Sequence, residues 1–286
     1  MKTALQAAPQ AVAIEQAQWS WKSVCQFIAR RIERSLDPST CLRYLQRLDF
    51  VRKRPKKRLL KADAAKRAAF VARYAALLDE AQTTGATIWF VDEAHFRADA
   101  DLRLRWVPKG QPALVDSTSP RWGEKASYSS AVCLETGAVE VMELDGNSCA
   151  ETSVAFLKQV RATRTGPLIV IWDNGPAHGG DALRDYLTTP DLNLRLVRLP
   201  AYSPDYNADE HIWGWVRAEV TANTCFGTAA KVREAVGAFF AGLAERAAEV
   251  KRRCRTRLQA EVDLLLAKAS RVVRVDDHVV PVRESV

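Results

Sequence analysis

The sequence predicts an α/β domain with a mixed sheet covered by helices on both faces, preceded by a small helical module. Apolar, strand-like stretches alternate with helix-like segments from residue 86 onward. Apolar residues in 21–48 recur only at helical spacing. The two parts also differ in charge. Residues 1–85 hold 17 Lys and Arg against 7 Asp and Glu, which leaves 25 against 27 for residues 86–286.

Composition narrows the class of protein. A chain of 286 residues with 48% apolar residues can bury one large core and a smaller one. No apolar run approaches the roughly 20 residues of a membrane-spanning helix, and the first residues lack a signal-peptide core. The six Cys are scattered without C-x-x-C spacing, which predicts reduced thiols. We therefore expect a cytoplasmic protein with no membrane contact and no organic cofactor.

The front of the chain predicts a helix-turn-helix. Residues 1–18 lack periodicity, so a loose tail is expected there. Trp21, Val24, Cys25, Ile28 and Ile32 recur at helical spacing and predict an amphipathic helix. After the break at Leu36-Asp37-Pro38, Ser39 can cap a second helix with Leu42, Leu45 and Leu48 on its inner side. An ordinary helical hairpin fits these residues equally well.

Basic residues follow the second helix and continue the charge of its outer face. Residues 52–58 read RKRPKKR, and the central Pro opposes helix formation. Such a segment can lie along DNA phosphates, with a solvated interdomain linker as the alternative. The predicted DNA contacts are Arg43, Arg47, Arg52, Lys53, Arg54, Lys56, Lys57 and Arg58. We place a domain boundary near residue 60, followed by a bridging helix over 61–82.

The elements beyond residue 85 define the predicted core. Strands are expected at 86–91, about 104–107, 126–133, 138–144, 168–172 and 194–199, and helices at 149–164, 179–188, 207–222 and 228–247. Three strands form a meander, and helices and strands then alternate. This is the ribonuclease H-like order of elements. Residues 251–286 begin with a basic run and include a β-like stretch at 271–275.

Carboxylates follow two of the predicted strands. Asp92 and Asp173 each come directly after a buried strand, and Glu210 lies on a predicted helix one turn before a core-facing stripe. Three carboxylates can hold two divalent cations, which activate a nucleophilic oxygen and stabilise a leaving oxygen in phosphodiester chemistry. The pattern predicts a phosphoryl-transfer site that uses two Mg²⁺, with Mn²⁺ as a substitute. Asn174 and His178 are candidates to orient water or phosphate around it.

Each of these residues also has a structural interpretation. Asp92 can begin a turn, Asp173-Asn174-Gly175 is a common turn sequence, and Asn207 with Glu210 fits a capping box. Asp209 competes with Glu210 for the role of ligand, and spacing does not decide between them. Glu93 is a weaker candidate, because its side chain should point to the other face of the strand.

Three motifs carry a family resemblance. VDEAHF at 91–96, WDNGPAH at 172–178 and AYSPDYNADEHIWGWVR at 201–217 resemble the DDE transposases of the insertion sequence 630 group, relatives of the mariner elements. The resemblance covers residues 86–246 and implies that Asp92, Asp173 and Glu210 form the catalytic triad. It also implies binding to terminal inverted repeats of double-stranded DNA, cleavage, strand transfer to a TA target, a homodimer that pairs two ends, and association with the nucleoid.

The chain departs from that family pattern at two places. Asn207-Ala208 stands where many relatives have Asn-Pro, and Asp209 replaces a usual apolar residue. Relatives commonly carry two helix-turn-helix units, and this chain matches the second, so both a complete transposase and a truncated or frameshifted copy are interpretations of the sequence.

The sequence thus predicts five segments: a tail at 1–18, the helix-turn-helix and linker at 19–60, a bridging helix at 61–85, the catalytic domain at 86–247 and a C-terminal tail at 248–286. One rival interpretation is an idle DNA-binding remnant that occupies inverted repeats and represses the active element. Another is a host nuclease or resolvase on the same fold, since fold does not determine function.

Overall fold

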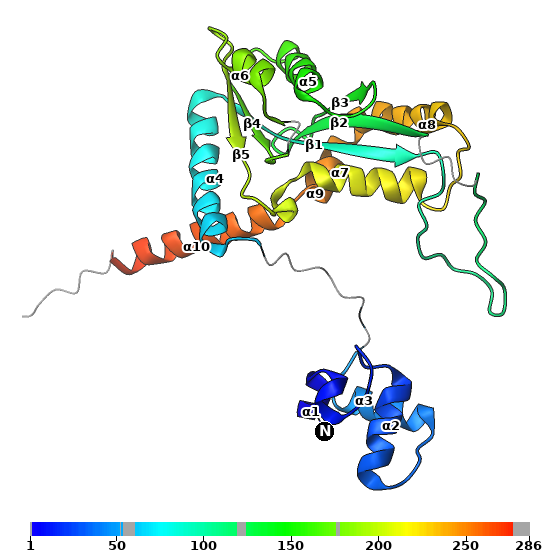
Figure 1. The fold of residues 1–286 in the computed structure, drawn as a ribbon. Coiled ribbons are helices and arrows are strands. Elements are labelled where there is room, and N and C mark those ends of the chain that lie inside the picture. The colour runs from blue at the N-terminus through cyan, green and yellow to red at the C-terminus, as the bar shows by residue number, and fades with distance from the viewer. Residues whose placement is uncertain (1, 52, 54–60, 119–123, 176–177, 277–286) are drawn as a thin grey trace, which may run out of the picture. The chain divides into compact units, whose positions relative to one another are not determined.

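The computed structural model describes residues 2–51, 53, 61–118, 124–175 and 178–276, and side chains of the last helix as far as residue 268. The chain divides into two compact units, residues 1–58 and 59–286 (Figure 1). None of the helices among the described residues has the length and apolar character that crossing a membrane requires.

The first unit is helical. Its elements are α1 (Lys2–Gln6), the 3₁₀ turn η1 (Pro9–Val12), α2 (Trp21–Ile32) and α3 (Pro38–Arg47). Leu5 and Ile14 are buried in one cluster with Val24, Phe27 and Ile28 of α2. The expectation of a loose tail is therefore wrong for residues 2–14, because two apolar side chains anchor this segment to the helices.

Local hydrogen bonds determine where the two longer helices begin. The Ser23 amide donates to Ser20 Oγ at 3.2 Å, and the Ser20 amide donates to Ser23 Oγ at 2.8 Å, which forms a capping box for α2. Asp37, and not Ser39 as predicted, caps α3, because its carboxylate accepts from the Ser39 amide at 2.8 Å. Pro38 then occupies the first turn, where a missing N–H costs nothing.

The buried side of α3 differs from the prediction at one position. Cys41 is fully buried, with Leu45 and Leu48 packed against the same cluster, while Leu42 is 46% exposed. Trp21 and Ile32 of α2 are also exposed. Cys41 thus takes the place of Leu42 in the inner stripe of α3, whereas Leu45 and Leu48 belong to it as predicted.

The second unit contains a five-stranded mixed sheet. Its elements are α4 (Ala64–Thr84), β1 (Thr87–Arg97), β2 (Lys125–Cys133), β3 (Val139–Leu144), α5 (Ala150–Ala162), β4 (Leu168–Trp172), α6 (Asp181–Leu187), β5 (Leu194–Arg198), η3 (Pro204–Tyr206), α7 (Asp209–Val216), the π-helical η4 (Arg217–Thr221), α8 (Ala229–Ala241), η5 (Gly242–Arg246), α9 (Ala247–Arg253) and α10 (Arg257–Asp276). The strand order is β3-β2-β1-β4-β5. The β1/β2 and β2/β3 pairs are antiparallel, and the β1/β4 and β4/β5 pairs are parallel. This order confirms the predicted fold class.

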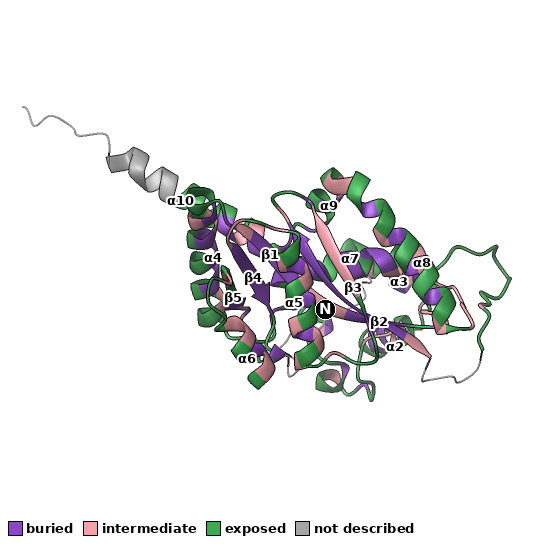
Figure 2. Cartoon of the chain, turned by 90° about the horizontal axis from the view of Figure 1, so that it is seen from above, coloured by how far each residue is buried: buried purple, intermediate pink, exposed green. Residues whose placement is uncertain are grey.

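Helices cover both faces of the sheet, as predicted (Figure 1). On one face, Trp89 and Val91 of β1 pack with residues of α5 and α6. On the other, Phe90 and Ala94 pack in a larger cluster with residues of α4, α7, α8 and α10. The strands β1, β2 and β4 are largely buried, the edge strands β3 and β5 are partly exposed, and the outer sides of the covering helices are exposed (Figure 2). Since side chains alternate along a strand, odd and even positions of β1 belong to different layers.

Two further expectations are corrected by the structure. Residues 104–107 form no strand but part of an extended loop, in which Leu104 and Trp106 are fully exposed. Residues 248–268 are not a separate tail, because Val250, Cys254, Leu258 and Val262 are buried in the larger core cluster. The β-like stretch at 271–275 belongs to helix α10.

Candidate active site

Asp92 lies within strand β1 and not at its end. The strand continues to Arg97 through antiparallel pairing with β2, which sequence pattern did not predict. Parallel pairing with β4 ends earlier, where Phe90 lies opposite Ile171. Asp92 and Asp173 each come two residues after this last pair. Both Asp residues therefore lie just beyond the paired part of β1 and β4.

The structure separates the neighbours Asp209 and Glu210, which spacing could not. Glu210 is solvent-accessible and lines a pocket of about 470 Å³ together with Asp173 and Asn207. Asp209 is fully buried, and Ser130 Oγ of β2 donates to its Oδ2. Glu210 thus faces the open space beside Asp173, whereas Asp209 points toward the core.

Asn207 determines how helix α7 enters this site. Its amide Nδ2 donates to the Val91 carbonyl at 2.9 Å, and its Oδ1 accepts from the Asp209 amide at 3.2 Å. The predicted capping box with Glu210 does not form, since α7 begins at Asp209 without a side-chain cap. Asn207 instead ties the helix start to β1 next to Asp92. Sequence analysis missed this role, although the residue lies in a motif that was singled out.

The carboxylates raise one another's pKa. Burial raises the pKa of Asp92 well above its usual range, and the charges of Glu210, Asp209 and Glu93 raise it further. Partial burial raises the pKa of Glu210, Arg217 opposes this rise, and Asp173 adds to it. The pKa of Asp209 is also raised, mainly because it is buried. The site thus concentrates negative charge that the protein only partly compensates.

His178 compensates part of that charge. Its Nε2 lies 3.1 Å from Glu93 Oε2 and 3.1 Å from Asp173 Oδ1, and its ring stacks on Trp172. Burial lowers the pKa of His178, but the bonds to Asp173 and Glu93 outweigh this and leave it above the usual value. The same bond to His178 lowers the pKa of Asp173. Asp173 is therefore held as a carboxylate.

The loop after β4 is held closely around Asp173. The Gly175 amide donates to Asp173 Oδ1 at 2.8 Å, and a Cβ at Gly175 would lie 2.9 Å from the His178 ring. A glycine is therefore needed at this close approach. Asn174 Nδ2 donates to the Leu199 carbonyl at 2.7 Å, and Arg198 Nη1 donates to the Asp173 carbonyl at 2.8 Å. Asn174 thus orients the loop toward β5.

The donor chemistry suits a divalent cation. Mg²⁺ prefers oxygen ligands, keeps several waters and needs few protein ligands. Asp92, Asp173 and Glu210 supply carboxylate oxygens, and the buried Oε1 of Glu93 and Oδ1 of Asp209 have no hydrogen-bond partner. Within the described ranges, no three His, Cys, Asp or Glu side chains converge on one point as they stand. The donor types present, carboxylates on β1, after β4 and on α7, fit a divalent cation.

The predicted DNA-binding residues are only partly described. Arg43 and Arg47 are exposed on α3, and Lys53 is exposed after it. Arg52, Arg54, Lys56, Lys57 and Arg58 lie outside the described residues. The outer face of α3 therefore presents two guanidinium groups to solvent.

Comparison with known protein families decides the classification. The family model described as DDE superfamily endonuclease matches residues 87–233, a range that includes all three predicted triad residues. The chain belongs to the DDE superfamily endonucleases. A second family model, described as winged helix-turn helix, matches residues 15–74 of this DDE endonuclease.

Solved structures similar to this DDE endonuclease share its fold. The Mos1 transposase paired-end complex with the left transposon end has a TM-score of 0.61 at 19% identity, and covers 89% of this chain and 77% of that one. The Mos1 strand transfer complex has a TM-score of 0.60 at 18% identity, with 89% and 76% covered. The Mos1 mariner paired-end complex with Mn has a TM-score of 0.57 at 18% identity, with 86% and 75% covered. No curated protein matches the sequence.

Proposed function

We propose that this DDE endonuclease is a transposase that cuts and joins double-stranded DNA through Asp92, Asp173 and Glu210. The observation that carries the proposal is their origin on three separate elements, β1, the end of β4 and α7, with Glu210 and Asp173 lining one pocket. The family match and the fold shared with Mos1 transposase complexes support it. The insertion sequence 630 group remains our assignment within this superfamily.

The three carboxylates are proposed to hold two Mg²⁺, or Mn²⁺ in their place. Mos1 mariner paired-end complexes with Mn and with Mg are among the similar structures. When bound, such ions lower the pKa of a water, neutralise phosphate charge and stabilise the leaving oxygen. In this proposal Asp92 and Asp173 would hold one ion, and Glu210 would hold the other.

The chain's own residues prepare this chemistry. His178 donates its Nε2 proton toward Asp173 and Glu93, which orients both carboxylates, and Arg198 and Asn174 hold the loop that carries Asp173. Asn207 binds the Val91 carbonyl and so fixes the start of α7, which carries Glu210, to the strand that carries Asp92. Because the strand ends and the helix start are linked by hydrogen bonds, the site keeps its shape before DNA binds.

Binding to DNA ends is assigned to the first unit. Arg43 and Arg47 on the exposed face of α3, followed by the basic residues at 52–58, would contact phosphates as α3 enters the major groove. We further propose recognition of terminal inverted repeats, a homodimer that pairs two ends, insertion at TA, and association with the nucleoid. The paired-end assembly of Mos1 supports the pairing of two ends.

A cleavage assay tests the proposal. Fragments of the DNA that flanks the gene of this chain are incubated with the protein and Mg²⁺ or Mn²⁺, and cuts are mapped to the nucleotide. We expect defined cuts by the native chain and none by Asp173→Asn. Cutting that persists in this variant would overturn the catalytic assignment. Binding without cutting by both proteins would instead support the DNA-binding remnant.

The DNA-binding assignment has its own test. Replacing Arg43 and Arg47 by Ala should weaken binding to the mapped end and reduce the slope of log K against log salt by about 1 for each lost phosphate contact. Replacing the exposed Arg31 and Arg34 by Ala, which removes the same charge outside α3, serves as the matched control on the same unit. An unchanged slope would exclude α3 from the DNA interface.

A further inference from the structure

Tyr202 is a pocket residue to which the proposed chemistry gives no role. It lines the same 470 Å³ pocket as Asp173 and Glu210, and its side chain is half exposed. A site in which carboxylates bind a phosphate through metal ions does not by itself need an aromatic ring. The position of this ring beside the carboxylates therefore requires a separate explanation.

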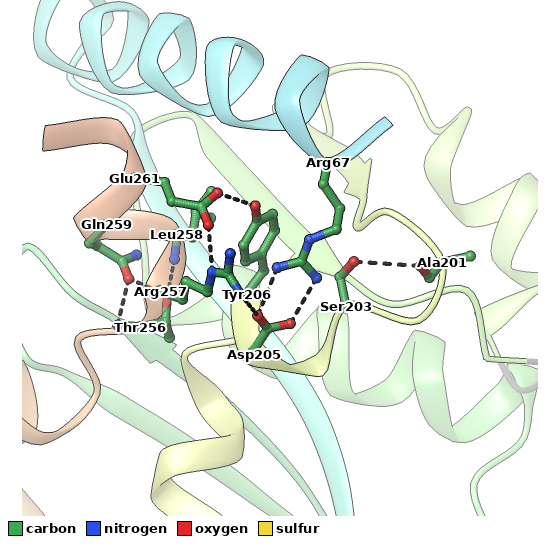
Figure 3. A network of polar contacts seen from close by, with 10 residues as sticks. All are labelled: Arg67, Ala201, Ser203, Asp205, Tyr206, Thr256, Arg257, Leu258, Gln259 and Glu261. Carbon is green, nitrogen blue, oxygen red and sulfur yellow. Dashed lines mark hydrogen bonds and ion pairs between the residues drawn. The ribbon is translucent and has the colours of Figure 1, made fainter. Parts of the chain in front are cut away.

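The backbone of Tyr202 is held in a costly conformation. Its φ is +58°, in the left-handed region that residues other than Gly, Asn and Asp rarely adopt. Ser203 Oγ donates to the Ala201 carbonyl at 3.4 Å and so bridges the two neighbours of Tyr202 (Figure 3). Such strain persists only where the surroundings enforce it, and it is concentrated at functional sites.

The residues that follow Tyr202 are fixed from two helices. Arg67 of α4 donates to both carboxylate oxygens of Asp205, at 2.8 and 2.7 Å, and its guanidinium lies 3.9 Å from the centroid of the Tyr206 ring. The Tyr206 hydroxyl donates to Glu261 of α10 (Figure 3). Bidentate pairs of this kind restrict orientation as well as distance. The turn η3 is thus a rigid base for the neighbouring ring.

The surroundings of the ring suit a nucleobase. Leu199, Pro200, Ala201 and Pro204 form an apolar wall of the pocket next to Asp173. The ammonium group of Lys61 lies 5.8 Å from the centroid of the Tyr202 ring, where it can also meet a phosphate. Aromatic side chains beside cations are the usual means by which proteins hold unpaired bases, because every base has a π-face.

We propose that Tyr202 is a stacking platform for a nucleobase of the DNA strand being cut, next to the phosphate that faces Asp173 and Glu210. The inference rests on the proposed function, because it places DNA in this pocket. The rigid turn would hold the ring so that the stacked base keeps the neighbouring phosphate in register with the carboxylates. Tyr202 would then act by positioning the strand and would take no part in proton transfer.

The test uses the full chain and the cut site mapped in the cleavage assay. Thymines within about three nucleotides of that site are replaced by 5-iodouracil, which on irradiation crosslinks to a stacked aromatic ring. Binding is measured on the Glu210→Gln background, so that the DNA stays intact. We compare Tyr202, Tyr202→Phe and Tyr202→Asn. Asn removes the ring but tolerates the left-handed backbone, so it should not lower the melting temperature.

We expect a crosslink at Tyr202, retained in Tyr202→Phe, and roughly ten-fold weaker binding by Tyr202→Asn. In the cleavage-competent chain, Tyr202→Asn should raise KM or spread the cuts over neighbouring nucleotides. The rate at saturating DNA should change less. Binding and cut position unchanged in Tyr202→Asn would overturn the inference while leaving the proposed function intact. Unfolding of Tyr202→Asn would also overturn it, because the ring would then serve stability. Failure of the native chain to cut would instead count against the proposed function.

Discussion

The two faces of strand β1 give neighbouring carboxylates opposite electrostatic surroundings. Asp92 faces the layer of α7, where Asp209 and Glu210 add negative charge and its pKa is raised. Glu93 points to the other face, where His178 lies 3.1 Å away and also binds Asp173. One face thus keeps its charge uncompensated, while the other neutralises it with an imidazole.

This difference separates Asp92 and Asp209, whose pKa values are raised without a cationic partner, from Glu93 and Asp173, which share His178. Like charges held together cost stability, and their retention points to function more strongly than a satisfied pair does. Substitutions on one face of β1 at a time test this difference.

The largest contrast is expected in cleavage. Glu210→Gln should reduce cutting of the mapped DNA end by about 10³-fold or more, because carboxylate-held ions contribute several kcal/mol to such transition states. Glu93→Gln should cost less than about ten-fold, since the amide oxygen can still accept from His178. Single-turnover cleavage rates measure both. Equal losses would show that the two faces are not functionally distinct.

A second contrast is expected in stabilisation by metal. Mg²⁺ at about 100 times its Kd should raise the free energy of unfolding by about 2.7 kcal/mol, because only the folded chain brings the carboxylates together. Urea unfolding with and without Mg²⁺ measures this rise, with NaCl at matched ionic strength as the control. The rise should vanish in Asp92→Asn and persist in Glu93→Gln. A rise that survives in Asp92→Asn would place the ion elsewhere.

The buried Asp209 should lower stability as pH rises. Its folded pKa lies above the unfolded value of about 3.9, so the folded state binds more protons and stability falls from about pH 4 upward. Asp209→Asn should therefore raise the free energy of unfolding at pH 8 by about 1–3 kcal/mol, with less effect near pH 4.5. Urea curves at both pH values test this. A variant that is less stable than the native chain at pH 8 would contradict it.

The smallest effect is expected from His178. Its folded pKa is raised, so its contribution is complete below the unfolded value of about 6.5 and is lost as pH rises through the folded pKa. His178→Gln should destabilise the chain by about 1 kcal/mol at pH 5.5 and by less at pH 8. The titration of His178 followed by NMR should also shift downward in Glu93→Gln. A pKa that stays unchanged in that variant would exclude the Glu93 bond.

Local pattern predicted most of the order of elements, with the strand expected at 104–107 as an error. Apolar strand-like stretches and helical spacing predicted the meander and the alternating half of the mixed sheet, because burial imposes a period on each element. The pattern also located Asp173, which directly follows a strand, and Glu210, which lies at the start of a helix. It failed where local signals are weak: Asp37 and not Ser39 caps α3, and residues 248–262 join the core through contacts with distant helices.

By itself, the sequence determined that Asp92 and Asp173 directly follow apolar runs and which motif precedes Glu210. Only the tertiary structure decided which of two adjacent acids faces the pocket, because the direction of Asp209 depends on Ser130, 79 residues away. The same holds for the bond from Asn207 to Val91, which spans 116 residues. Composition and period act over a few residues, whereas the shape of this site depends on contacts between segments that only the folded sheet brings together.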